Sequence, residues 1–317
     1  MRPSRGAVLV TGGAGFVGSH VVRRLSRTRP VIVLDDLSTG RIDNLPRGIE
    51  FVAGDVRCEA DLSAALAGGV EAIVHCAAQT SVARSMAEPD SDWSINVAGT
   101  RQVARLAQHF GVERFVFFSS GGAIYGDTPV LAPESQLPQP LSHYGLNKYV
   151  AEQIVRLEAP SYAILRPSNI YGAGQRFDQE GGVVSIFLER LLGDGQVEIY
   201  GDGRQRRDFV YIDDVVDAVE LALEMRGNEV WNVSSGESTS VLELLLALES
   251  LTGRRAAMIR RPSRAGDVNT SLLAPDRLMA TGRWGPPAGL MTGLQRLLAG
   301  ANLKDTSIAA VPVGPAS

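Results

Sequence analysis

The sequence predicts an α/β fold, a Rossmann-type doubly wound parallel sheet with a smaller C-terminal substrate-binding lobe. Three observations carry this prediction. The apolar, β-branched run Ala7–Val10 is typical of a buried parallel strand, and a glycine-rich turn follows it. A helix-like stretch, Phe16–Arg27, comes after the turn. Strand-like and helix-like segments then alternate through the first half of the chain, which indicates parallel strands joined by crossover helices.

The later elements follow the same alternation as far as Pro167. We expect strands at Val31–Leu34, Ile49–Val52, Ala72–His75, Arg114–Ser119 and Tyr162–Leu165. We expect helices at Glu59–Leu66, Asp92–Phe110 and Ser142–Glu158. Beyond Pro167 the rhythm changes to loops and glycine turns. What stands out there is an amphipathic stretch at Val183–Leu192, then a strand at Phe209–Ile212 and a helix at Asp213–Met225.

This change of rhythm predicts two lobes. Residues 1–170 form the predicted dinucleotide-binding domain, and 209–232 return to its sheet. Residues 171–317 mostly form the predicted substrate lobe, in which 234–299 are expected to be largely helical. The tail Ala301–Ser317 is rich in Ala, Pro, Gly, Val and Ser, and is expected to be poorly ordered.

Composition narrows the class of protein. The 317 residues are 44% hydrophobic and 21% charged, as in ordinary soluble proteins, and the net charge of −4 argues against nucleic acid as a partner. The two cysteines, Cys58 and Cys76, have no metal or disulfide spacing and fit a reducing cytoplasm. No apolar run approaches the roughly 20 residues of a membrane helix. The short N-terminal run ends in the glycine turn, so it is expected to be a strand and not a signal peptide.

The glycine turn has the spacing of a dinucleotide-binding site. Gly12, Gly15 and Gly18 stand three residues apart. The first can make the tight turn, the second lets the backbone approach a pyrophosphate, and the third lets helix and strand pack closely. The free N–H groups of the following helix favour a phosphate there. Asp35 ends the next strand, at the place of a ribose-binding carboxylate.

Tyr144 and Lys148 lie four residues apart in the predicted helix Ser142–Glu158, so both side chains lie on one face. An ammonium group near a phenol favours the phenolate and lowers its pKa. A tyrosine tuned in that way can act as a general base at neutral pH. Tyrosine and lysine often stand four apart by chance. Here a dinucleotide turn precedes them and a Ser119-Ser120 strand end lies between, so we predict a catalytic pair.

With these residues in place, the chain resembles the extended short-chain dehydrogenase/reductases, and most of all the nucleotide-sugar 4-epimerases of the UDP-galactose 4-epimerase type. The resemblance extends from Ala7 to Leu298. It rests on ordered motifs: TGGAGFVG (11–18), LDDLSTG (34–40), GDV (54–56), HCAAQTSV (75–82), NVAGT (96–100), SSGGAIYG (119–126), YGLNK (144–148), RPSNIYG (166–172), GDGRQRRDFVYIDDV (201–215) and RAGD (264–267).

The resemblance implies NAD as cofactor. Asp35 would bind the adenosine ribose, and Asp55 with Val56 would contact adenine, although Asp55 also reads as a strand-end cap. An acid at the end of the second strand repels a 2′-phosphate, and no arginine directly follows it, which favours NAD over NADP. His75 is expected to be structural. The other implied cofactor residues are Gly12, Gly15, Phe16, Val17, Gly18, Asp36, Ser38, Thr39, Gly40, Cys76, Ala77, Ala78, Gln79, Thr80, Asn96, Ser119, Tyr144, Lys148 and Ser168.

The loop 119–126 discriminates within the family. Nucleotide-sugar 4,6-dehydratases carry an Asp-Glu pair here, and the related uronate decarboxylases carry a Glu. This chain has Gly121, Gly122 and Ala123, so elimination lacks its acid and base. Many epimerases place a catalytic Ser or Thr where Gly121 stands. Ser120 is expected to supply that hydroxyl, with Ser119 as the alternative.

The resemblance also implies a nucleotide-sugar substrate linked to UDP or dTDP. Arginine suits a diphosphate because its planar fork donates two hydrogen bonds. Asp267 would accept from a ribose hydroxyl, and Asn169 would donate to a phosphate or sugar oxygen. The full set of implied substrate residues is Ser81, Asn169, Val183, Arg207, Arg264 and Asp267.

The predicted reaction is inversion at C4 of a hexose through a transient 4-keto sugar. Tyr144 would remove the 4-OH proton, Lys148 would hold the nicotinamide ribose, and Ser120 would hydrogen-bond the 4-oxygen. The rivals are a UDP-glucuronate decarboxylase or 4-epimerase, a 4,6-dehydratase, a 4-reductase, an NADP enzyme and a non-catalytic NAD-binding regulator. The nucleotide and the sugar (hexose, N-acetylhexosamine or uronic acid) stay open.

A homodimer is also expected. Relatives in this family pair the two long helices predicted at Asp92–Phe110 and Ser142–Glu158 across a two-fold axis, and two-fold dimers are the commonest soluble assemblies. The apolar residues that could face outward are Val97, Val103 and Leu106 on the first helix and Val150, Ile154 and Leu157 on the second. The alternative is that all six pack on the sheet of a monomer.

Overall fold

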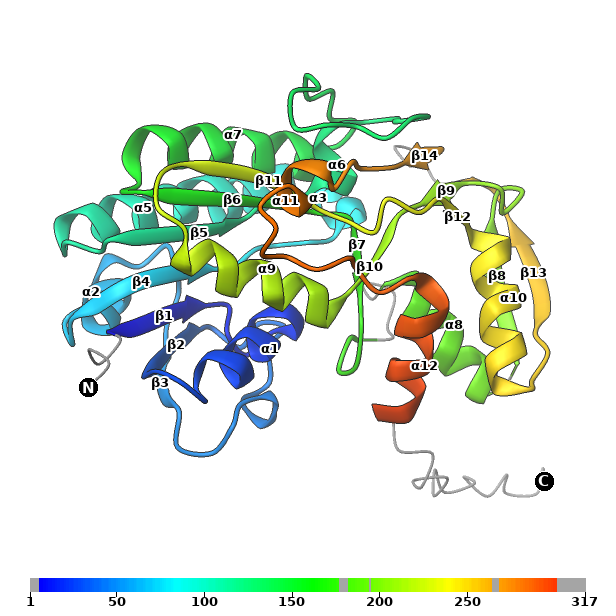
Figure 1. Ribbon diagram of the computed structural model, residues 1–317, viewed down its shortest axis with the longest axis horizontal. Coiled ribbons are helices and arrows are strands. Elements are labelled where there is room, and N and C mark those ends of the chain that lie inside the picture. Colours follow the sequence, from blue (N-terminus) through cyan, green and yellow to red (C-terminus); the bar gives the residue numbers. More distant parts are fainter. Residues whose placement is uncertain (1–5, 177–181, 194, 264–267, 301–317) are drawn as a thin grey trace, which may run out of the picture.

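A parallel sheet forms the centre of the computed structural model, which describes residues 6–176, 182–193, 195–263 and 268–300 (Figure 1). Its strand order is β11-β6-β5-β4-β1-β2-β3, and each neighbouring pair is parallel. The predicted doubly wound sheet is confirmed. Its seven strands are β1 (Ala7–Thr11), β2 (Val31–Asp35), β3 (Glu50–Ala53), β4 (Val70–His75), β5 (Arg114–Phe118), β6 (Tyr162–Pro167) and β11 (Glu229–Val233).

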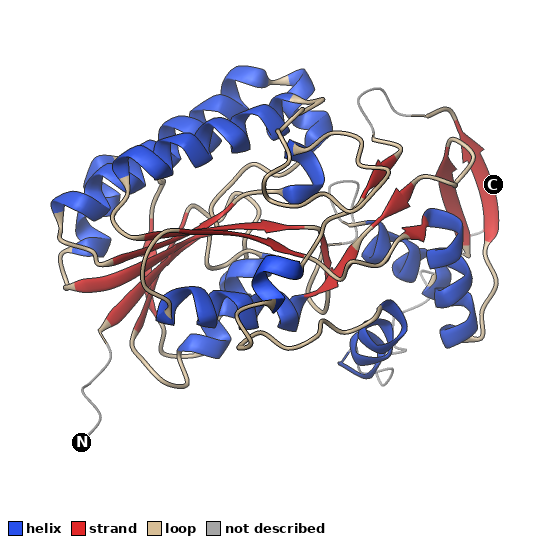
Figure 2. Cartoon of the chain, turned by 45° about the horizontal axis from the view of Figure 1, so that its top comes forward, coloured by secondary structure: helices blue, strands red, loops and turns tan. Residues whose placement is uncertain are grey.

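Helices cover both faces of this sheet (Figures 1 and 2). One face carries α1 (Phe16–Leu25) and α9 (Ile212–Glu224), and the other carries α2 (Glu59–Leu66), α5 (Thr100–His109) and α7 (His143–Glu158). Side chains alternate along each strand, so Val8 and Val10 join the first core while Leu9 joins the second. Both faces are therefore buried, as a parallel sheet requires.

The segment between β4 and β5 differs from its prediction. In place of one helix over Asp92–Phe110, the chain forms α3 (Val82–Ala87), α4 (Pro89–Trp93), a π-helical turn η2 (Ser94–Gly99) and then α5. A proline at the first position starts α4 before Asp92. π-helical turns are rare and often lie at functional sites.

The outward-facing residues of the expected dimer helices are partly corrected. Val97, Val103 and Leu106 are buried in the chain's own core, because their helix face packs on the sheet. On α7, Leu157 is 84% exposed, and Val150 and Ile154 are half-buried. Of these six residues, those available to a second copy are therefore on α7.

The second lobe is built from short strands and helices that pack beside the sheet (Figure 1, right). Its strands form small separate sheets that join segments far apart in sequence. The strands are β7 (Asn169–Tyr171) with β10 (Phe209–Tyr211), β8 (Gln196–Tyr200) with β13 (Ala257–Arg261), and β9 (Arg206–Arg207) with β12 (Thr239–Ser240) and β14 (Thr270–Ser271). The helices are α8 (Val183–Leu192), α10 (Val241–Thr252), α11 (Asp276–Met279) and α12 (Leu290–Gly300). Two short elements complete the described chain, η1 (Ile42–Asn44) after β2 and α6 (Gly121–Ile124) after β5.

Two expectations about this part are corrected. The strand that returns to the central sheet is β11, whereas β10, expected at Phe209–Ile212, pairs with β7 outside that sheet. The segment 234–299 also contains β12, β13 and β14 and is not mostly helical. These strands escape a pattern-based prediction because they are short or, as in β13, mostly exposed.

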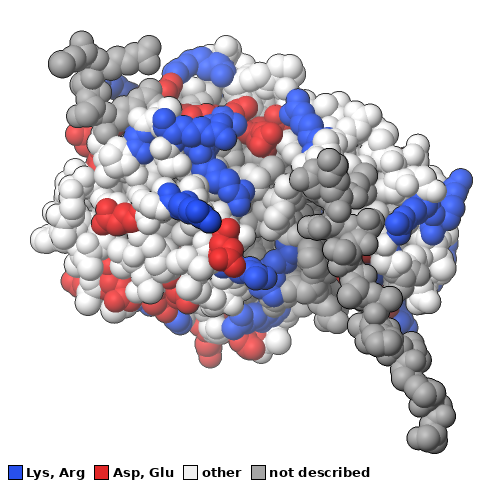
Figure 3. All heavy atoms as spheres, turned by 90° about the horizontal axis from the view of Figure 1, so that it is seen from below, with Lys and Arg blue, Asp and Glu red and all other residues white. Residues whose placement is uncertain are grey.

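Charges of both signs lie side by side on the face seen from below (Figure 3). Arg24 of α1 pairs with Asp217 and Glu220 of α9. Within the described ranges, no helix is long and apolar enough to cross a membrane. The tail Ala301–Ser317 and the predicted substrate residues Arg264 and Asp267 lie outside the described residues.

Candidate active site

The glycine turn between β1 and α1 packs closely against its own backbone and the loop after β4. Gly12 has φ +67°, and a Cβ there would lie 2.6 Å from the Ala77 nitrogen. A Cβ on Gly18 would collide with the Gly12 carbonyl oxygen. Helix α1 begins at Phe16 after Gly15, with no side-chain cap and no acid in its first turn. Its N–H groups and the positive end of its dipole therefore fit a pyrophosphate.

Asp35 lies at the end of β2 with its carboxylate held by main-chain N–H groups. Its Oδ2 accepts from Ala14 at 2.9 Å and its Oδ1 accepts from Leu37 at 2.8 Å. Burial raises the pKa of this carboxyl, and the two backbone bonds oppose that rise. A Cβ on Gly40 would lie 2.9 Å from Asp35 Oδ1, so the loop folds closely over the carboxylate.

The other predicted cofactor residues near Asp35 have different surroundings. Asp36 is exposed and accepts from the Ser38 N–H and hydroxyl, and Thr39 is exposed as well. Val56 is buried. The Asp55 carboxylate accepts from Arg57 Nε at 2.9 Å, and that guanidinium lowers the carboxyl's pKa. This pairing agrees with the strand-end alternative for Asp55, and its adenine contact stays a prediction.

The loop after β4 is fixed by two amide side chains. Asn96 from η2 accepts from the Gln79 N–H at 3.1 Å and donates to the Gln79 carbonyl at 2.9 Å. The Gln79 side chain in turn donates to the Ser81 carbonyl and accepts from the Ser81 N–H. Cys76, Ala77 and Ala78 are half-buried beside the glycine turn, and Thr80 is exposed. The structure thus brings the predicted cofactor loop and the substrate residue Ser81 together.

Tyr144 and Lys148 are both buried on the first turns of α7. Ser142 caps this helix by accepting from the Gly145 N–H at 3.2 Å. Lys148 Nζ donates to the Phe118 carbonyl at the end of β5, at 2.8 Å. Burial lowers the pKa of Lys148 to about 8. The pair therefore lies at the carboxyl edge of the sheet, the same edge at which β1 enters the glycine turn.

The electrostatics of Tyr144 differ from the sequence prediction. Burial raises its pKa to about 12; a hydrogen bond from Ser120 lowers it, and the Asp92 charge raises it further. The Lys148 ammonium group donates to the Phe118 carbonyl, and the lowering expected from Lys148 stays a prediction. Burial in the protein alone therefore favours the protonated form of Tyr144.

The two candidate serines have different surroundings. Ser119 Oγ donates to Glu152 Oε1 at 2.5 Å, and Glu152 is also bound by the buried Arg166 at 2.6 and 2.8 Å. The Ser119 hydroxyl is therefore hydrogen-bonded to the buried Glu152–Arg166 ion pair, which links α7 to β6. Ser120 is only half-buried and reaches the Tyr144 hydroxyl. This geometry favours Ser120 over Ser119 as the reacting hydroxyl.

Two glycines are needed for the close packing around this loop. A Cβ on Gly121 would collide with the Leu273 side chain and lie 2.9 Å from the Arg166 carbonyl oxygen. A serine or threonine does not fit there. A Cβ on Gly145 would collide with the Ala123 carbonyl oxygen, so α7 approaches the loop closely only because it carries glycine next to Tyr144.

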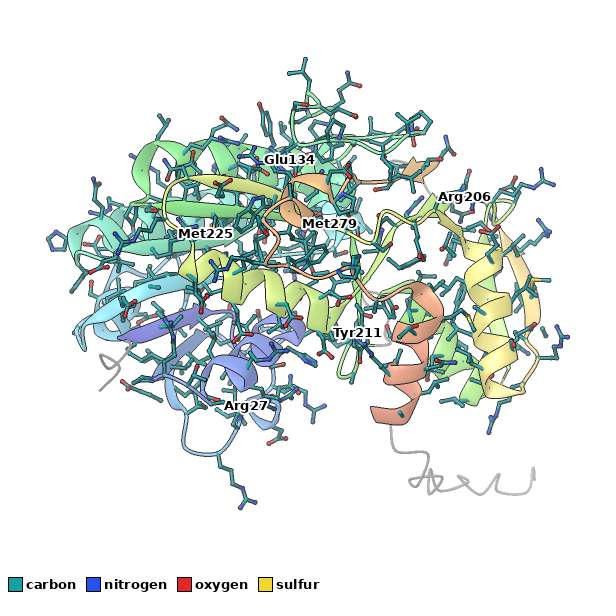
Figure 4. All side chains as sticks on the ribbon, in the orientation of Figure 1. Arg27, Glu134, Arg206, Tyr211, Met225 and Met279 are labelled. Carbon is teal, nitrogen blue, oxygen red and sulfur yellow. The ribbon has the colours of Figure 1, made fainter. Side chains whose placement is uncertain are left out.

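The predicted substrate side has a cavity of about 210 Å³. Asn169 and Val183 line it together with Ile170 and Phe209. Asn169 Nδ2 donates to the Asp208 carbonyl at 3.0 Å, and the Ser168 hydroxyl donates to the Asp208 carboxylate at 2.9 Å. Arg207 is half-buried on β9 and donates to the Arg206 carbonyl at 2.9 Å. The neighbouring Arg206, labelled in Figure 4, forms an ion pair with Glu243.

His75 is a structural residue, as expected. Its ring nitrogens lie 2.6 Å from the Thr11 hydroxyl and 3.0 Å from the Thr100 hydroxyl. Complete burial lowers its pKa to about 3, so the ring is neutral. Among the described residues, no group of three or more His, Cys, Asp or Glu side chains could hold a metal ion.

Three buried acids around the site were not predicted from the sequence. Asp92 joins the loop after β4 to α7, Glu152 joins α7 to β6, and Asp208 joins Ser168 to Ser235 and Gly236. A weak sequence signal exists for Asp92, since Asn96 follows it at helical spacing. Glu152 likewise stands four residues after Lys148. For Asp208 the local sequence gives no such signal, because its partners are distant in the chain.

The chain is similar to known proteins of one family. Residues 8–234 match the NAD dependent epimerase/dehydratase family. The UDP-glucose 4-epimerase of Mycolicibacterium smegmatis is 38% identical over 91% of this chain and 96% of its own. Crystal structures of UDP-glucose 4-epimerase from Thermotoga maritima, with UDP-glucose, and from Thermus thermophilus, with NAD, superimpose with TM-scores of 0.88 and 0.87. They share 39% and 38% identity, and each comparison covers 92% of this chain and 97% of the other. The protein is therefore a member of the NAD dependent epimerase/dehydratase family.

Proposed function

We propose that this protein is an NAD-dependent 4-epimerase that interconverts UDP-glucose and UDP-galactose through a transient 4-keto sugar. The observation that carries the proposal is the meeting of Ser120, Tyr144 and Lys148 at the carboxyl edge of the sheet, beside a loop without an acid. The similarity to UDP-glucose 4-epimerases over most of the chain supports UDP as the nucleotide and glucose as the sugar.

The residues have separate roles in this reaction. Tyr144 Oη takes the proton of the sugar 4-OH and later returns a proton to the 4-oxygen. Ser120 donates a hydrogen bond to that oxygen, and Lys148 supplies a positive charge to the same small, buried region. When bound, NAD supplies the acceptor and donor of the C4 hydride together with a positive ring charge. That charge favours the phenolate, which the protein alone disfavours by burial.

The loop around Gly122 supports epimerisation over elimination. A Cβ on Gly122 would lie 4.0 Å from Asn169 Nδ2, so the loop borders the substrate cavity. Gly121, Gly122 and Ala123 place no carboxyl group there. Loss of water from C5 and C6 needs an acid and a base that this loop does not carry, whereas oxidation and reduction at C4 need only the residues already described.

A panel of nucleotide sugars tests the proposal. UDP-glucose, UDP-galactose, UDP-N-acetylglucosamine, UDP-glucuronate and dTDP-glucose are each incubated with the enzyme and catalytic NAD, and the products are read by NMR. We expect interconversion of UDP-glucose and UDP-galactose as the fastest reaction, with Tyr144→Phe as the inactive control. Net release of water or carbon dioxide, or consumption of one NADH per product, would assign a dehydratase, decarboxylase or reductase instead.

We also propose that Asp35 selects NAD over NADP. Its carboxylate, already held by Ala14 and Leu37, would accept from the ribose hydroxyls and repel a 2′-phosphate. Asp35→Ala should weaken NAD binding and reduce the preference for NAD over NADP. Titration of the variant with each cofactor measures both effects. Asp43→Ala, at an exposed acid of η1, is the matched control. Tighter binding of NADP by the wild type would contradict this assignment.

We further propose a cytoplasmic homodimer that pairs α7 with its copy across a two-fold axis. The surface consists of Leu146, Val150, Ile154 and Leu157 on α7 and Trp93 next to it, of which Leu157 is 84% exposed. Leu157→Glu should give a monomer in sedimentation equilibrium, and Leu246→Glu, an equally apolar exposed position on α10, should not. A wild type that sediments at the 33.8 kDa of one chain would refute the dimer.

A further inference from the structure

Asp92 is a buried carboxylate whose side-chain hydrogen bonds come from neutral amides. Its side chain belongs to α4 and the residue is 1% exposed. Oδ1 accepts from Gln79 Nε2 at 2.6 Å and from Asn96 Nδ2 at 3.0 Å. Oδ2 accepts from Asn147 Nδ2 at 2.7 Å. A carboxylate in this position carries a large desolvation cost, which these hydrogen bonds offset.

Each of the three amides leads to a different part of the site. Gln79 holds Ser81, a predicted substrate residue, by two hydrogen bonds. Asn96 holds the main chain of Gln79 and so fixes the predicted cofactor loop. Asn147 lies on α7 between Tyr144 and Lys148. One carboxylate therefore connects the substrate side, the cofactor side and the helix that carries the base.

The geometry suits a carboxylate better than an amide at position 92. Three N–H groups converge on its two oxygens, so both oxygens must accept. In an asparagine, one oxygen would accept from Gln79 and Asn96, but the new NH₂ group would face the Asn147 NH₂ group. Two donors would then face each other in a buried site, unless the Asn147 side chain turned by 180° and carried its NH₂ group to the place of its Oδ1.

We propose that Asp92 is a positioning residue that locks the base helix α7 to the loop 79–81, so that Tyr144 and the bound sugar keep one fixed spacing. Its effect on turnover rests on the proposed function, while its effect on the loop and helix does not. A misplacement of about 1 Å can cost about 100-fold in rate, which sets the scale of the expected effect.

The charge of Asp92 predicts a second measurable effect, a change in the pH dependence of kcat. Its negative charge raises the pKa of Tyr144 and that of Lys148. The other charged or titratable groups that face this pair are His75 and Cys76 at the end of β4 and Glu152 on α7. Asp35 faces Cys76. Removal of the Asp92 charge should therefore make the Tyr144 phenolate easier to form.

The test is a charge swap across one hydrogen bond. Asp92→Asn in the NAD-loaded enzyme should lower kcat about 10- to 100-fold with little change in KM, and should move the acid limb of the kcat profile to lower pH. In the double variant Asp92→Asn/Asn147→Asp, the amide introduced at position 92 accepts from Gln79 and Asn96 and donates to the carboxylate introduced at position 147. This variant should recover kcat to within a few-fold of wild type and return the acid limb. Glu249→Gln, a buried acid of the second lobe, is the matched control.

Hydrogen exchange separates this proposal from the proposed function. Amide exchange in the loop 79–82 and the first turn of α7 should rise in Asp92→Asn and fall again in the double variant, whatever substrate the wild type accepts. If the wild type turns over none of the nucleotide sugars, the proposed function fails, and the exchange measurement still decides the role of Asp92. If Asp92→Asn does not fold, a folded and active double variant supports the lock. Unchanged kcat, pH profile and exchange in Asp92→Asn, or a folded double variant that recovers neither, would overturn it.

Discussion

The base helix and the substrate lobe hold their polar groups in different ways. Tyr144 and Lys148 on α7 are buried and directed by Ser120 and the Phe118 carbonyl. Arg207 on β9 is half-buried, with a guanidinium that contacts main-chain carbonyls of its own lobe. The reacting side is thus preorganised, whereas the recognition side keeps contact with water. Substitutions on the first should change kcat, and those on the second should change KM.

Removal of the base gives the largest expected effect. Tyr144→Phe deletes only the phenolic oxygen, so the ring still packs at the start of α7. Loss of a general base should lower kcat by about 10²–10⁴-fold. Equilibrium titration should show NAD binding close to wild type. Steady-state kinetics that stay near wild type would show that another group takes the 4-OH proton.

Ser119 and Ser120 should differ in what their removal changes, stability in one case and kcat in the other. Ser120→Ala should lower kcat about 10- to 100-fold with stability nearly unchanged, because its hydroxyl reaches Tyr144. Ser119→Ala should keep kcat but cost about 1–3 kcal/mol of stability, because a buried bond to Glu152 is lost. Kinetics and urea unfolding of both variants measure the split. The reverse pattern would make Ser119 the reacting hydroxyl.

Substitutions in the substrate lobe should change KM more than kcat. Arg207→Ala removes a guanidinium suited to a diphosphate and should raise KM about 10-fold with kcat nearly constant. Arg206→Ala is the control, since that neighbouring side chain pairs with Glu243 and Ser238. Initial rates over a range of UDP-glucose concentrations distinguish the two. An equal rise in KM for both variants would remove Arg207 from the substrate site.

The two regions also differ in how their stability depends on pH. His75 beside the cofactor loop has its pKa lowered to about 3, so the unfolded chain binds its proton first and stability falls as pH drops below 6.5. Asp208 in the second lobe has its pKa raised to about 6 by burial, so its contribution falls as pH rises from about 4 to 6.

Unfolding free energies measured in urea between pH 4 and 7 test these opposite signs. His75→Phe should weaken the loss of stability in acid by up to one proton, about 1.4 kcal/mol per pH unit. Asp208→Asn should remove the decline between pH 4 and 6 that this carboxyl contributes. Its remaining oxygen can still accept from Ser168 and Ser235, and the bond from the Gly236 N–H to Oδ2 is lost. The same slope in the wild type and in His75→Phe would show that His75 is not the group held neutral.

Local patterns were enough to predict the central part of the molecule. The strand–glycine–helix unit at β1 and α1 and the Tyr144/Lys148 pair each lie within a few residues, so their geometry follows from turn and helix spacing. NAD as cofactor and the parallel sheet are confirmed by the family and the fold. The lack of an acid in the loop 119–126 could also be predicted, because that loop is one short stretch of sequence.

The remainder depends on contacts between distant segments. In the strand pairing, Arg207 of β9 lies opposite Thr239 of β12 and Ser271 of β14. Strand β11 pairs with β6, although β7 to β10 lie between them in the sequence. Asp92 finds its partners Gln79 and Asn147 on other elements. The raised pKa of Tyr144 comes mainly from burial, which helical spacing does not reveal. These features needed the assembled fold.

The central claim is that one carbon is oxidised and then reduced within a single enzyme-bound cycle. The most direct test uses UDP-glucose deuterated at C4, with the NAD-loaded enzyme and no added reductant. The account predicts UDP-galactose that keeps the deuterium at C4, seen by NMR and mass spectrometry, with no net formation of NADH. Loss of the deuterium from C4, a product lacking water or carbon dioxide, or no inversion at C4 would contradict it.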